Sequence, residues 1–144
     1  MPTESPTGIP VSVLLAQRIA PNADTSQIAD AVVATWREID AALVPIIGSR
    51  GLAALYKRSI HCSAQAHPWL RIEHDAALAV VDFTELIPLL RQQDSITAMA
   101  GAAMLFSTFH QLLSSVVGSA LTERLMRPVW IDAPGDPAQK DSKT

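Results

Sequence analysis

A long stretch without formal charge constrains the fold of this chain more than any other feature. Between Ile96 and Leu121, the only side chain that can become charged is that of His110. A run of this length is either a candidate for a transmembrane span or a helix buried in a soluble domain. The weakly hydrophobic SITAMAGAA opens the run, and no aromatic belt brackets it, which favours the soluble domain. We expect one buried helix that is capped by Ser95 and continues to about Arg127, before Pro128.

The polar residues of this segment also favour a soluble helix, because they form a narrow stripe at helical spacing. The stripe consists of Ser107, Gln111, Ser114 or Ser115, Gly118 and Thr122. The opposite side consists of Leu105, Phe109, Leu112, Val116 and Leu121.

A second long amphipathic helix is predicted upstream. Asp24 followed three residues later by Gln27 has the pattern of a capping box. We expect Pro45 to bend the last turn and Gly48 to end the helix. Apolar residues recur between these signals at steps of three and four positions, namely Ile28, Val32, Trp36, Ile39, Leu43 and Ile46.

Shorter helices complete the predicted fold. We expect them at residues 11–20, at about 50–66, and from Asp82 or Thr84 through LIPLLRQQ. Residues 71–83 fit a short helix or an ordered connector better than a strand, because nothing nearby would pair with a strand. LVPII at 43–47 and LIPLL at 86–90 echo each other, but five residues are too few to establish a duplication.

These elements predict an all-α fold, a single-domain bundle of five to six helices around the long C-terminal helix. The bundle should span residues 10–130. We expect disorder at residues 1–9 and 131–144, because the tail is rich in Pro, Asp and Lys and the start is similar.

Composition narrows the function classes. The net charge of −3 argues against a nucleic-acid partner, which a basic stripe would recognise. Charged residues make up 17% of the chain, below the roughly 25% of typical domains. So few charges indicate an apolar surface that meets a partner, and we expect a homodimer. Small residues would allow close helix approach, namely Ala98, Ala102, Gly118 and Ala120.

The lone cysteine, Cys62, excludes an intramolecular disulfide and favours a reducing compartment. The N-terminus lacks the basic region and apolar core of a secretory signal. We therefore expect a cytoplasmic protein with no membrane association. His61, Cys62, His67 and His74 are metal-ligand types, but their spacing does not match known sites, so neither a metal nor a cofactor is expected.

The strongest candidate site is a polar strip on the predicted helix at 50–66. Lys57, His61 and Gln65 lie one turn apart, with Arg58 alongside, and face away from the apolar residues. An exposed histidine beside cations suits a phosphoacceptor or a phosphate sensor. Histidine-phosphotransfer domains carry a lysine three residues after their histidine, where this chain has Ala64, so that family is not assigned. The alternative is an ordinary solvated helix face.

A second candidate is a ligand pocket formed by Phe106, Phe109 and His110 on the long apolar helix. A buried imidazole among aromatic rings could ligate a haem or hold another apolar ligand. A hydrogen-bonded core histidine is the commoner case.

No catalytic motif is present. The chain contains no G-x-S-x-G, no P-loop, no G-x-G-x-x-G and no H-E-x-x-H. We therefore expect a non-enzymatic helical module for regulation or protein interaction, dimeric, in bacterial signalling. Phosphotransfer or phosphate sensing at His61 is the first alternative, and a ligand or haem carrier at His110 is the second.

Overall fold

The computed structural model describes Leu15, Ile19 and residues 22–72 and 81–131, the last two residues by their backbone alone. The described residues are all-helical and contain no strand, which confirms the predicted fold class. They form four α-helices and two short 3₁₀ helices, so the expected five to six helices are not confirmed.

Several predictions concern other parts of the chain. The helix expected at 11–20 lies outside the described residues except for Leu15 and Ile19. The segments expected to be disordered, 1–9 and those after Ile131, also lie outside the described residues. The same holds for residues 73–80, within the segment 71–83 that was expected to be a short helix or a connector. Leu15 is fully buried in the core.

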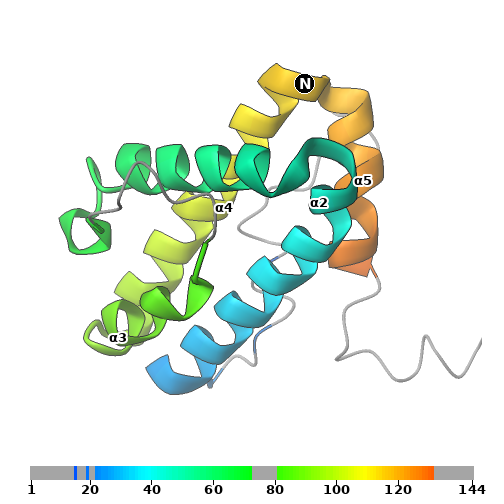
Figure 1. Ribbon diagram of the computed structural model, residues 1–144. Helices are drawn as coiled ribbons and strands as arrows, with labels where there is room; N and C mark the ends of the chain where they lie inside the picture. Colours follow the sequence, from blue (N-terminus) through cyan, green and yellow to red (C-terminus); the bar gives the residue numbers. More distant parts are fainter. Residues whose placement is uncertain (1–14, 16–18, 20–21, 73–80, 132–144) are drawn as a thin grey trace, which may run out of the picture.

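Helix α2 (Thr25–Ser63) begins at the predicted capping box. The Asp24 carboxylate accepts a hydrogen bond from the Gln27 backbone N–H, and the Gln27 side chain accepts one from the Asp24 N–H, both at 2.9 Å. Gly48 then bends the chain into two arms (Figure 1). Its φ of 81° lies in the region that favours glycine, so the prediction that Gly48 ends the first helix is confirmed.

The single helix expected from Ser95 to Arg127 is wrong. The chain instead forms α4 (Ser95–Val117) and α5 (Ser119–Ile131), separated by Gly118 with φ 93° and ψ 151°. Packing explains the break, because α5 turns back and contacts α2 as well as α4. Local propensity would have continued the helix, but burial of the α5 side chains outweighs it.

The ends of these two helices also differ from expectation. Asp94, not Ser95, caps α4, and its carboxylate accepts a hydrogen bond from the Thr97 backbone N–H at 2.7 Å. Pro128 lies inside α5 instead of following it.

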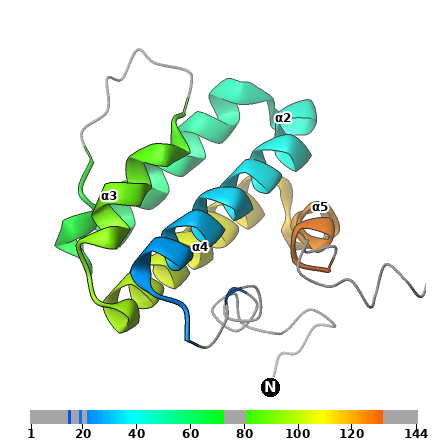
Figure 2. The ribbon, with the colours of Figure 1, turned by 90° about the horizontal axis from the view of Figure 1, so that it is seen from below.

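The first arm of α2 packs along α4 at the centre of the molecule (Figures 1 and 2). The 3₁₀ helix η2 (Phe83–Glu85) leads into α3 (Leu86–Arg91), which packs on α2. As predicted, Asp82 starts this region, since its carboxylate accepts a hydrogen bond from the Thr84 N–H. The second arm of α2 leads into η1 (Pro68–Leu70).

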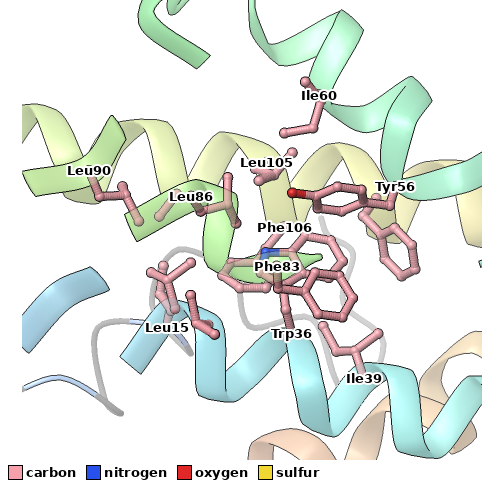
Figure 3. Packing of buried hydrophobic residues seen from close by; sticks show 14 of the residues in the cluster. Leu15, Trp36, Ile39, Tyr56, Ile60, Phe83, Leu86, Leu90, Leu105 and Phe106 are labelled. Carbon is pink, nitrogen blue, oxygen red and sulfur yellow. The ribbon is translucent and has the colours of Figure 1, made fainter. Parts of the chain in front are cut away.

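Trp36 is the centre of an aromatic core (Figure 3). Its ring stacks on Phe106 at 4.7 Å and on Phe83 at 5.5 Å between centroids. Tyr56 and Phe109 meet it edge-on at 5.1 and 5.0 Å. Offset stacks and edge contacts are the favoured aromatic geometries, so the five rings form one packed unit.

The structure reveals an internal repeat with a separation of 70 residues. Asp24 and Asp94 cap the two long helices in the same way, and Gly48 and Gly118 break them with similar dihedral angles. The pairs in which both members are buried are 28/98, 32/102, 35/105, 36/106, 39/109, 43/113, 52/122, 56/126 and 59/129. Each unit is thus a capped helix, a glycine bend and a second helix.

The two repeat units pack face to face. Trp36 and Phe106 are equivalent positions, and their rings stack on each other. The contact between the two units therefore includes a pair of equivalent residues at its centre. The sequence similarity between LVPII at 43–47 and LIPLL at 86–90 is therefore not part of this repeat, because residues 43–47 correspond to 113–117.

Burial corrects two further expectations. Ile46 was expected on the apolar stripe, but its side chain is 54% exposed beside the bend at Gly48. Ala98 and Ala102 were expected to permit contact with a second copy, yet they are buried inside this chain. They allow the α2 arm and α4 to approach each other instead.

Candidate functional site

Three residues of the predicted polar strip line a pocket of about 640 Å³. Lys57, His61 and Gln65 come from the end of α2 and the turn after it. Arg71, which follows η1, adds a second cation. The apolar part of the lining consists of Ile60, Ala64, Pro68 and Ile72. This cavity is called the His61 pocket below.

Helix geometry places the strip. Residues four apart lie on one face of a helix about 6 Å from each other, so Lys57 and His61 are neighbours on α2, and Gln65 in the turn after it extends them to a row of three. Tyr56 and Ile60 face the core on the other side of the same arm. As predicted from the spacing, the His61 side chain is exposed.

The turn after α2 and the chain that follows it form the wall of the His61 pocket opposite this row. The backbone N–H of His67 donates to Ser63 O, and that of Arg71 donates to Pro68 O at 3.0 Å, which closes the turn. Pro68 stands at the first position of η1, where proline needs no hydrogen-bond donor. The turn therefore directs the chain back along α2 and brings Arg71 to the pocket.

Trp69 fixes this corner to α4. Its side chain is half-buried and packs against the core. The six-membered ring lies so close to Gly101 that a Cβ there would overlap it. Gly101 thus positions η1, and through it one wall of the His61 pocket.

The fourth residue of the strip, Arg58, is exposed and does not line the His61 pocket. Cys62 is half-buried, at the edge between the core face and the strip. The structure therefore places Lys57, His61 and Gln65 together and separates Arg58 from them.

Sequence reasoning missed Arg71 and the apolar wall. The polar strip was visible from the helical period, but Arg71 lies beyond the proline that ends the helix. Only the turn at residues 64–70 brings the two segments together, and no spacing rule encodes that turn.

The second predicted site lies in the core. The side chains of Phe106 and Phe109 are 2% and 0% exposed, and both pack on Trp36. His110 is half-buried, and burial lowers the pKa of its imidazole, although the carboxylate of Glu123 opposes this shift. A ligand bound between His110 and the rings of Phe106 and Phe109 would have to displace the aromatic core.

Another pocket, of about 410 Å³, opens near the bend of α2. Its charged lining residues are Arg37, Asp40 and Asp82. The pKa of the Asp82 carboxyl is lowered by hydrogen bonds from Thr84, so that side chain already serves as a cap. This pocket could not be predicted from the sequence, because its residues come from distant segments.

Tyr56 and Glu85 form a polar contact at the edge of the core. The Tyr56 hydroxyl donates to Glu85 Oε2 at 3.0 Å, and burial together with the nearby carboxylate raises the pKa of the hydroxyl. This bond joins the second arm of α2 to η2, so its role is structural.

The repeat units differ at the His61 pocket. At a separation of 70 residues, Lys57 corresponds to Arg127 and His61 to Ile131. The positive charge is common to both units, whereas the imidazole belongs to the first alone.

Metal binding finds no support in the parts of the chain that the structure describes, where no three His, Cys, Asp or Glu side chains cluster. Two helices, Thr25–Ser63 and Ser95–Val117, are long and apolar enough to cross a membrane. Core helices pass the same test, so this is weak evidence either way.

Comparison with known protein families, with curated proteins and with solved structures finds no match to this chain.

Proposed function

We propose that this chain is a non-enzymatic regulatory module that recognises an anionic group, such as phosphate, in the His61 pocket. One observation carries the proposal: two cations and an imidazole from two separate segments line the same cavity. Hydrogen bonds from charged donors to phosphate or carboxylate are stronger than neutral ones. The volume of about 640 Å³ lies within the range of small-molecule sites.

A binding role also agrees with the sequence, which contains no G-x-S-x-G, P-loop, G-x-G-x-x-G or H-E-x-x-H motif. Lys57, Arg71 and Gln65 offer donors at different positions around His61. This arrangement suits the several acceptor oxygens of a phosphate.

Calorimetric titration with inorganic phosphate tests the proposal. Replacing Lys57 by Gln, or Arg71 by Gln, should weaken binding about five- to tenfold, as expected for one partly exposed charged hydrogen bond. Arg58→Gln is the matched control, because Arg58 is a neighbouring exposed cation outside the pocket. Equal losses in all three variants, or no binding by the natural chain, would refute the proposal.

Phosphotransfer is a second candidate, favoured by the exposure of His61. An imidazole nitrogen would attack the phosphorus of an aspartyl phosphate, and the P–O bond to the departing carboxylate would break. The ring would then release its N–H proton to water. Incubation with labelled aspartyl phosphate donors should give an acid-labile label that His61→Gln abolishes; an unlabelled natural chain excludes this candidate.

We also propose that the module acts as a homodimer in a signalling pathway of the bacterial cytosol. Exposed apolar side chains at the two ends of α4 support the dimer, since Ile96 and Val116 are 84% and 64% exposed and α4 carries no Asp, Glu, Lys or Arg. Light scattering at micromolar concentration should give twice the chain mass, and a monomer would contradict this assembly.

A further inference from the structure

The His61 pocket has two chemically different walls. Lys57, His61 and Gln65 form its polar row, with Arg71 on the returning chain. An apolar lining lies beside the row, formed by Ile60, Ala64, Pro68 and Ile72.

The polar row is also extended. Lys57 and His61 lie one helical turn apart, about 6 Å along α2 at 1.5 Å per residue, and Gln65 follows in the turn after the helix, so Lys57 and Gln65 lie at opposite ends of the row. A single inorganic phosphate contacts only part of such a row. It also leaves the apolar wall without an apolar partner.

We infer that the ligand is an amphipathic anion, a phosphate head with a hydrocarbon body, and not an inorganic ion. The head lies among the cations and His61, while the body covers Pro68 and Ile72. Burial of each methylene against such a wall strengthens binding through the hydrophobic effect. This inference rests on the proposed function and names the chemical class of its ligand.

The position of Ile72 supports this assignment. Its side chain is only partly buried, and it packs on the edge of the core while lining the cavity. An apolar residue in this position offers surface to a ligand. By contrast, Ile60 is 1% exposed and serves mainly the core.

A chain-length series tests the inference. Methyl, butyl and hexyl phosphate are titrated into the intact protein and compared with inorganic phosphate. We expect affinity to rise about two- to fourfold per methylene, the upper value being that of a fully buried methylene. Hexylamine, which has the same body and the opposite charge, should not bind.

The outcomes separate the two claims. If methyl and hexyl phosphate bind equally, anion recognition stands and the amphipathic ligand is wrong. If no phosphate compound binds, both are wrong.

A variant locates the apolar contact. Ile72→Ala should leave inorganic phosphate binding unchanged and reduce the gain from methyl to hexyl phosphate at least threefold. Ile87→Ala is the control, because Ile87 is likewise partly buried on the core but outside the pocket. The same reduction in both variants would overturn the assignment of the wall.

Such a head group occurs in free molecules and in lipids. Phosphatidylcholine vesicles with and without phosphatidic acid distinguish the sources. Binding to the acidic vesicles in competition with hexyl phosphate assigns the head group to a lipid. Binding of hexyl phosphate alone assigns the ligand to a free molecule.

Discussion

Single residues at the ends and bends of helices determine this structure. The capping box of Asp24 and Gln27 was predicted from its pattern and is present, because such a cap depends on neighbours in sequence. The cap of α4 was predicted one residue away, at Ser95. Ser and Asp are both good caps, and local sequence does not choose between adjacent candidates.

Gly101 is the residue whose role depends most on a distant contact. It looked like an interior glycine of an apolar helix, whereas the structure places Trp69 against it. No sequence pattern connects two positions that belong to different elements.

Gly101→Ala should therefore destabilise the protein and weaken anion binding. The methyl group forces the Trp69 ring away at a cost of about 1–3 kcal/mol, offset by about 1 kcal/mol of helix propensity. Chemical denaturation should show a net loss of about 1 kcal/mol, and phosphate titration a loss of affinity. At Gly51 a Cβ makes an ordinary contact with Ile47 at 3.4 Å, so Gly51→Ala should be neutral or stabilising. A stabilised Gly101→Ala variant with full binding would contradict the account.

At the scale of elements, helical periodicity found the long helices but not their breaks. The first arm of α2 carries the predicted stripe, and Ile28, Trp36 and Leu43 are buried. The break at Gly118 was missed because glycine inside a helix is a weak signal. Because of this break, the buried face of α5 does not continue the apolar face of α4, so Val116 is exposed and Thr122 is buried.

Gly118→Ala tests whether this bend is intrinsic to the fold. At φ 93° and ψ 151° a residue with a Cβ is strained, although no atom lies within 4 Å of the added carbon. We expect a loss of about 1–3 kcal/mol in the free energy of unfolding, measured by urea denaturation. Gly48→Ala should behave alike, because its backbone conformation is similar.

The opposite result would be informative. If Gly118→Ala is as stable as the natural chain while Gly51→Ala is also unchanged, then α4 and α5 tolerate a straight connection. In that case the bend would not require glycine.

At the scale of the whole molecule, the described chain consists of two related units that pack against each other. Few residues are identical between them, which explains why the sequence did not reveal the repeat: Asp24/Asp94, Leu43/Leu113, Gly48/Gly118, Ser49/Ser119 and Leu55/Leu125. What the units share is burial at equivalent positions, and burial becomes visible only in three dimensions.

The candidate site follows the same division. The part of the site that begins on α2 could be predicted, because Lys57, His61 and Gln65 follow one another at steps of four residues. Arg71 and the apolar wall could not, since the turn through Pro68 and the anchor at Trp69 bring them there. The residue equivalent to His61 in the second unit is Ile131, so the proposed binding site belongs to the first unit alone.

The most direct test of the central claim is an NMR titration of the intact chain with inorganic phosphate, following the imidazole signals of the histidines. His61→Gln identifies the His61 signal by its disappearance. The account predicts a saturable shift at His61, with little change at His110, whose side chain faces a different part of the fold. An unshifted His61 signal, or a larger shift at His110, would contradict it.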